Sequence, residues 1–150
     1  YAEGDATRSA IDDEAEAAAE DALEPVDDFL RDLTGQANAT LDDRADRAAI
    51  AACVLAQVAD WARAGALGDL GSETAQITFG SRLAGFGLVL MQVQPHARNG
   101  GDIAIARDWL AGLARREIAF WETDAPPGAA SGNLRLWAAL GVAAAAAVLD

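Results

Sequence analysis

The sequence predicts an all-helical protein. Apolar residues recur at spacings of three and four between Gly and Pro residues, which is the period of a helix with one buried side. The β-branched residues are scattered, and no segment shows the sustained alternation of a half-buried strand. With 150 residues, 52% of them hydrophobic, the chain is long enough to bury a core. We therefore expect five or six helices that form one domain or part of one.

The N-terminal third is predicted to be an acidic outer layer. Residues 12–23 are rich in Ala and Glu, and Pro25 suits the first turn of a short second helix that ends at Gly35. Residues 1–50 hold 15 of the 24 acids but only 4 of the 11 cations, all of which are Arg. This segment therefore carries most of the net charge of −13.

Residues 41–64 are predicted to form a long core helix. Asp42 and Asp43 favour the positive end of its dipole, and Gly65 is suited to end it. Its apolar stripe consists of Ile50, Val54, Val58 and Trp61. Cys53 has small apolar neighbours in this helix, so it is interpreted as a buried core residue and not as a nucleophile.

Three more helices are expected after the loop at residues 68–71. The first covers about residues 72–93, stops before Pro95 and carries the apolar set Ile77, Leu83, Phe86 and Leu90. The second covers residues 102–121, with Asp102 as its N-cap and an apolar side made of Ile105, Trp109, Leu113 and Ile118. After a loop at residues 125–132, the last helix runs from near Asn133 towards Asp150 without a stop signal, which we interpret as a truncation within a larger domain.

Composition and missing motifs exclude several classes of function. The excess of acids and the absence of Lys argue against a nucleic-acid partner. The longest apolar run, residues 137–149, is shorter than the roughly 20 residues of a membrane span, so no membrane partner is expected. No zinc spacing, phosphate-binding Gly loop or GxSxG motif is present, and we expect no metal or other cofactor. His96 follows Pro95 in a polar segment and is interpreted as an ordinary exposed His.

Four segments, taken in order, resemble the mannuronan-cleaving alginate lyases. Residues 1–8 are similar to the family's N-terminal Glu-Gly-Asp and Arg stretch, and residues 53–67 are similar to its Cys and Trp-Ala helix end. Residues 71–87 resemble the following helix without the family's usual Lys-Trp pair. Residues 131–139 lie where the family carries Asn-Asn-His-x-x-Trp, so Asn133 and Trp137 match and Leu134 replaces the catalytic His.

This resemblance covers roughly the whole chain and implies the N-terminal part of one α/α toroid, an incomplete barrel of antiparallel helix pairs. Residues 1–40 would form an acidic lid and outer layer, and residues 41–150 the toroid helices. The implied activity is cleavage of a 4-linked uronic acid polymer, such as alginate or glucuronan, by β-elimination in the periplasm or outside the cell. Periodicity alone does not separate a toroid from a helix bundle.

The resemblance also implies the site residues. Asn133 would act as a catalytic amide donor that neutralises the uronate carboxylate, although Asn is also a favourable helix N-cap and both roles are compatible. The candidate substrate-binding residues are Arg135, Arg8, Tyr1, Gln76, Thr74 and Trp137. The alternative for Arg135 and Arg8 is an ordinary solvated surface Arg, and Trp137 is interpreted first as a packing residue of the toroid wall and second as a support for a sugar ring. Leu134 cannot transfer a proton, so two alternative functions follow. The first is a divergent lyase that uses a Tyr beyond Asp150, and the second is a uronan-binding domain without catalytic activity. The third hypothesis is a helical interaction domain whose resemblance to the lyases is coincidental.

Overall fold

The structure, a computed structural model, describes residues 13–98, 100–129 and 132–150. All regular structure in these residues is helical, which confirms the predicted class. The helices are α1 (Asp13–Asn38), α2 (Arg47–Arg63), α3 (Glu73–Val93), α4 (Gly100–Ala119) and α5 (Asn133–Leu149). Two 3-10 turns, η1 (Ala39–Leu41) and η2 (Gln94–His96), follow α1 and α3, and a π-helical turn, η3 (Phe120–Asp124), follows α4.

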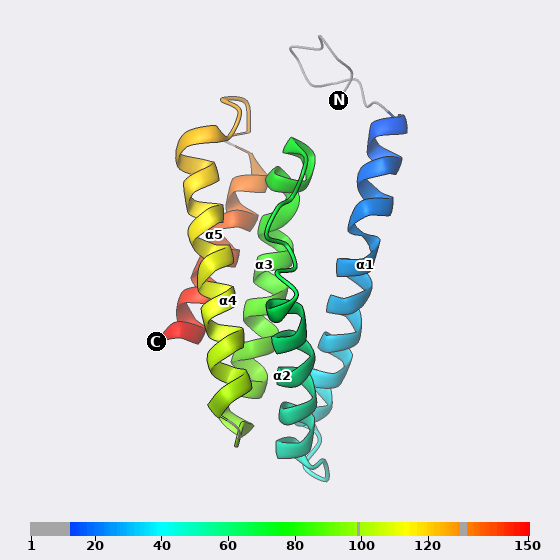
Figure 1. The fold of residues 1–150 in the computed structure, drawn as a ribbon, viewed down its shortest axis with the longest axis vertical. Coiled ribbons are helices and arrows are strands. Elements are labelled where there is room, and N and C mark those ends of the chain that lie inside the picture. The colour runs from blue at the N-terminus through cyan, green and yellow to red at the C-terminus, as the bar shows by residue number, and fades with distance from the viewer. Residues whose placement is uncertain (1–12, 99, 130–131) are drawn as a thin grey trace.

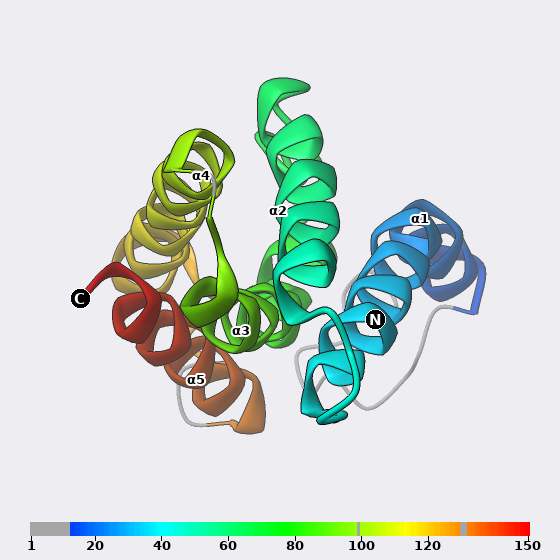
Figure 2. The same ribbon diagram turned by 90° about the horizontal axis from the view of Figure 1, so that it is seen from below.

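The helices form two layers. Consecutive helices run in opposite directions (Figure 1). Viewed from below, α1, α3 and α5 lie side by side in one layer, and α2 and α4 pack on one side of it (Figure 2). All helices within a layer therefore run in the same direction. The central helix is α3, which contacts the other four.

The core lies around α3 and between the layers. Its largest fully buried side chains are Phe86, Leu33, Leu55, Leu83, Leu90, Leu110, Leu113, Val54, Val58, Val93 and Val148. Aromatic contacts join neighbouring helices: the ring of Phe29 stacks on Trp61 with centroids 4.0 Å apart, and Phe86 meets Trp109 edge-on at 5.0 Å. The apolar set predicted for residues 72–93 is confirmed as buried.

Helices α3 and α5 pack unusually closely because glycines line their contact. A methyl group placed at Gly80 would lie 2.4 Å from the backbone nitrogen of Ala138, and one at Gly141 would lie 2.6 Å from the carbonyl oxygen of Gly80. Further along the pair, a methyl group at Gly87 would lie 2.7 Å from the side chain of Ala144. The two backbones are thus in direct contact over several turns.

The two helices predicted at the N-terminus are a single helix. The expected break before Pro25 is wrong, because α1 continues through this residue. Pro25 lacks a backbone N–H and so removes one helical hydrogen bond. Val26, Leu33 and Ala37 lie in the core on both sides of the missing bond, and this packing holds the helix together.

The core helix predicted from residue 41 begins later, at Arg47. The side chain of Asp46 accepts a hydrogen bond from the N–H of Ala49 at 3.1 Å and so fixes the N-terminus. The predicted end of this helix is confirmed, since α2 stops at Arg63 and Gly65 adopts a φ of 67°.

The predicted burial of Cys53 is wrong. The buried side of α2 is formed by Ala51, Val54, Leu55, Val58 and Ala59. Cys53 lies on another side of the helix and is exposed. Its sulfur accepts a hydrogen bond from Nε2 of Gln57 at 3.3 Å, so it lies within a polar contact between α1 and α2.

The prediction for α4 is wrong in its N-cap and in part of its apolar side. The helix begins two residues before Asp102, which therefore lies in the first turn and is not the N-cap. Ile118, which was expected on the apolar side, is 40% exposed. The buried side of α4 instead continues from Leu110 and Leu113 to Glu117. A carboxyl group thus occupies a position where an apolar residue was expected.

Candidate functional site at one end of the helix layers

The predicted site residues of α3 and α5 lie at the same end of the molecule. The two helices run in the same direction, and Gly80 faces Ala138. At this register Gln76 is level with Leu134, so the first turns of both helices are side by side. Five of the predicted residues therefore lie near the same end of the molecule, namely Thr74, Gln76, Asn133, Arg135 and Trp137.

These five side chains are accessible to different degrees. Thr74, Asn133 and Arg135 are exposed, Gln76 is half-buried, and Trp137 is 47% exposed. Tyr1 and Arg8, the other two predicted residues, lie outside the described residues. An indole that is half exposed at a helix start offers a flat apolar surface to a ligand.

Asn133 is not the N-cap of α5. The cap position is held by Gly132, and no side chain makes a capping hydrogen bond there. Asn133 is the first helical residue, one position too late for its side chain to cap the turn. Its amide therefore lies on the surface next to the positive end of the helix dipole.

The five residues do not line one common cleft. Gln76 lines a hollow of about 290 Å³ beneath the loop between α2 and α3, which we call the loop hollow. Arg135 instead lines an apolar hollow of about 360 Å³ between α4 and α5. Asn133 and Trp137 line neither of the two. The buried residue Glu117 lies in the wall of both hollows.

The loop over the loop hollow is strained and anchored. Leu67 adopts a φ of 59°, which a branched side chain rarely adopts. The guanidinium group of Arg116 donates hydrogen bonds to the backbone carbonyls of Leu67 and Gly68, and the indole N–H of Trp109 donates to the carbonyl of Ala66 at 3.0 Å. Helix α4 therefore holds this loop in its strained conformation.

Glu117 is a buried carboxyl group with a single hydrogen-bond partner. Its side chain belongs to a residue that is 3% exposed, and Oε1 accepts a hydrogen bond from Nε1 of Trp121 at 2.9 Å. Within the described residues, Oε2 accepts no hydrogen bond. Burial raises the pKa of Glu117, and the bond from Trp121 opposes this effect. Sequence reasoning missed this residue, although it continues the buried spacing of Leu110 and Leu113.

Replacing Glu117 with Gln is expected to change how stability depends on pH. Because the pKa of Glu117 is raised in the folded protein, native stability falls as pH rises from the ordinary value of about 4.3 through the folded value. A Gln does not titrate, so Glu117→Gln should gain stability relative to the native protein over this range. Thermal unfolding across a pH series measures the difference. Glu122→Gln, at an exposed position, is the control, and a difference for Glu117→Gln that stays constant with pH would contradict the assignment.

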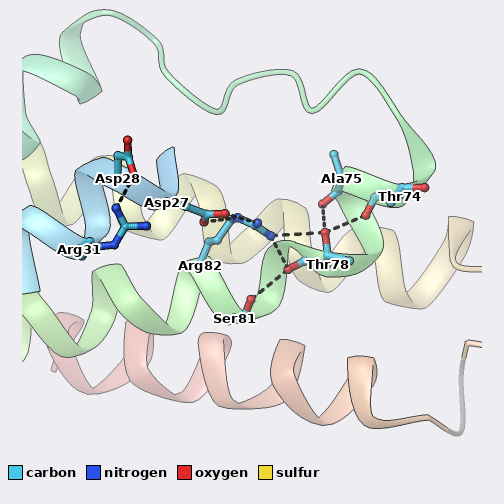
Figure 3. Close-up of polar contacts among 8 residues, drawn as sticks. All are labelled: Asp27, Asp28, Arg31, Thr74, Ala75, Thr78, Ser81 and Arg82. Atoms are coloured by element: carbon cyan, nitrogen blue, oxygen red, sulfur yellow. Dashed lines mark hydrogen bonds and ion pairs between the residues drawn. The ribbon is translucent and has the colours of Figure 1, made fainter. Parts of the chain in front are cut away.

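The groove between α1 and α3 is acidic. It has a volume of about 650 Å³, and five carboxyl groups of α1 lie in its wall, from Glu20, Asp21, Glu24, Asp27 and Asp28. Arg82 of α3 forms two hydrogen bonds with the carboxylate of Asp27, at 2.8 and 2.7 Å (Figure 3). Thr78 lies beside this pair and donates to the carbonyl of Thr74 at 2.8 Å (Figure 3). With Arg82 already paired, this groove is unfavourable for an anionic ligand.

The remaining candidates for a function are His96, a metal site and a membrane-spanning helix. His96 is partly exposed and belongs to η2, near the opposite ends of the helices. Among the described residues, no three His, Cys, Asp or Glu side chains are grouped so that they could hold a metal ion. In the same part of the chain, no helix combines the length and apolar character needed to cross a membrane.

Comparisons with known proteins identify no relative of this chain. No family model, no curated protein and no solved structure matches the chain.

Proposed function

We propose that this chain is part of an α/α toroid that binds a 4-linked uronic acid polymer and cleaves it by β-elimination. The two layers support this architecture, because helix hairpins placed side by side put every second helix in the same layer (Figure 2). As in the alginate lyases that the sequence resembles, we propose a periplasmic or secreted location.

The observation that carries the proposal is the shared position of the α3 and α5 N-termini. The segments that resemble the lyases are far apart in the sequence, yet Thr74 and Gln76 in the first turn of α3 lie at the same end of the molecule as Asn133 and Arg135 in the first turn of α5. Two parallel helix N-termini add their positive dipole ends at this point, which favours an anionic group such as a uronate carboxylate.

Each side chain has a role in the proposed chemistry. The guanidinium group of Arg135 would hold the uronate carboxylate, and the amide of Asn133 would donate to it as charge develops during removal of the C5 proton. The exposed indole of Trp137 would support a sugar ring. Gln76 and Thr74 would bind sugar hydroxyl groups from the neighbouring helix.

A second candidate function is uronan binding without cleavage. It is favoured by Leu134, which is half-buried in the first turn of α5 and carries no group that transfers a proton. None of the other residues that the structure places at this end is a Tyr or a His. The same five residues would then bind the polymer, and no product would form.

Asn133→Ala is expected to lower the rate of unsaturated-product formation about 100-fold, since it removes one donor to the developing charge. The measurement is the ultraviolet absorbance of 4,5-unsaturated uronate during incubation with polymannuronate, polyguluronate and glucuronan. Loss of activity in this variant supports elimination at the α3 and α5 N-termini.

Asn38→Ala is the matched control, because Asn38 ends α1 near the opposite ends of the helices and is also exposed. It should keep the native rate. Equal rates for both variants would contradict the proposed site. Native protein that binds a uronan but forms no product would support the binding function and overturn the lyase function.

A further inference from the structure

The loop hollow combines a deep carboxyl group with two acids at its rim. Glu117 lies in its wall and is nine-tenths or more buried, with Oε2 lacking a hydrogen-bond donor among the described residues. Asp69 and Asp124 also line the hollow and are exposed. Oε2 is not fully enclosed by protein atoms, so a ligand that donates a hydrogen bond could reach it and supply the missing partner.

The cationic side chain that lines this hollow, Arg116, already donates hydrogen bonds within the protein. Arg116 uses its two terminal nitrogens on the carbonyl groups of Leu67 and Gly68. Three carboxyl groups and a single guanidinium group, which already binds the loop, therefore line the hollow. A concave surface with this excess of acids concentrates cations, and the net charge of −13 adds to the effect.

Apart from Gln76, the remaining side chains of the wall are apolar, and the volume is small. Phe79 and Phe120 line the hollow together with Leu67 and Leu70. Aromatic walls bind hydrocarbon groups and also attract cations at their faces. A volume of about 290 Å³ is at the lower end of the range for small-molecule sites.

We propose that the loop hollow binds a small organic cation, an ammonium group attached to an apolar or aromatic body. The ammonium group would donate to Oε2 of Glu117, and the rim acids would attract it. The apolar body would pack against Phe79 and Phe120. This site differs from the proposed uronan site in the charge of its ligand, although Gln76 borders both.

Benzylammonium is the probe for this proposal, with benzyl alcohol and phenylacetate as its neutral and anionic counterparts. Binding to the 150-residue protein is followed by the NMR signal of the Trp121 indole N–H, which contacts Glu117. The Trp137 signal serves as an internal reference. We expect benzylammonium to bind at least about tenfold more tightly than either counterpart, since a hydrogen bond to a charged group stabilises by more than a neutral one.

Glu117→Gln keeps the side-chain volume and an acceptor for Trp121 but loses the charge. It should weaken benzylammonium binding about tenfold or more. Glu122→Gln, an exposed change in the adjacent turn, should leave binding within about twofold of native. Both variants retain the fold if their far-ultraviolet circular dichroism matches the native protein. Absence of benzylammonium binding, tighter binding of phenylacetate, or equal binding by Glu117→Gln and native protein would overturn the proposal.

Discussion

Gly80→Ala is expected to destabilise the protein by about 3 kcal/mol, because the new methyl group has no space between α3 and α5. It would lie 2.4 Å from the backbone nitrogen of Ala138 and 2.5 Å from its α carbon. Backbone atoms cannot rotate away as the end of a side chain can. The two helices must therefore separate, and the contacts around Leu83 and Gly141 must loosen with them. Urea unfolding followed by circular dichroism measures the loss.

Gly112→Ala is the matched control for this prediction. Gly112 lies in the middle of α4, and a methyl group there has no other atom within 4 Å. The change should therefore stabilise the helix by about 0.5–1 kcal/mol, because Ala loses less backbone freedom on folding than Gly. Equal effects of the two substitutions would show that α3 and α5 are not in the close contact described here.

Phe86→Ala is expected to cost about 4 kcal/mol, since it removes the largest fully buried side chain and leaves a cavity. Phe86 lies at the centre of α3 and meets Trp109 at 5.0 Å and Phe29 at 6.2 Å between ring centroids. Its loss would loosen both layers at the same time. The fluorescence of the tryptophans during urea unfolding gives the free energy of unfolding.

Leu136→Ala provides the comparison for this effect. Leu136 is 73% exposed on α5, so its truncation should change the free energy of unfolding by less than about 0.5 kcal/mol. A loss at Phe86 as small as that at Leu136 would contradict the placement of the core around α3.

The helical class and the position of α3 could be predicted because their signals are local. Ser72 was expected to start this helix, and its side chain caps it by accepting from the N–H of Ala75 at 3.2 Å. The apolar spacing of Ile77, Leu83 and Phe86 also places one side of α3 in the core. Such features depend only on neighbours within a few residues of the chain.

Other features depend on contacts between distant segments and could not be read from the spacing. Pro25 suggested a helix start, yet packing of α1 against the core carries the helix past it. Cys53 lies in an apolar sequence but faces the polar contact with Gln36. Glu117 is buried because α4 turns this side inward, a rotation that one helix alone does not determine.

In the candidate site, too, the residues could be selected from local sequence, but their arrangement depends on contacts between distant segments. The resemblance selected Thr74, Gln76, Asn133, Arg135 and Trp137, and their proximity follows from the parallel contact of α3 and α5. That contact depends on Gly80, Gly87 and Gly141, which lie at matching positions on two helices that are distant in the sequence. The strained loop at Leu67 gave no signal, because a left-handed Leu has no sequence signature.

Calorimetric titration with an oligouronate of the native protein, Arg135→Gln and Arg44→Gln tests the proposed uronan site most directly. Both arginines are exposed, but Arg44 precedes α2 near the opposite ends of the helices. We expect binding by the native protein, about tenfold weaker binding by Arg135→Gln and native affinity for Arg44→Gln. No binding by the native protein, or equal affinities for the two variants, would contradict uronan recognition at the starts of α3 and α5.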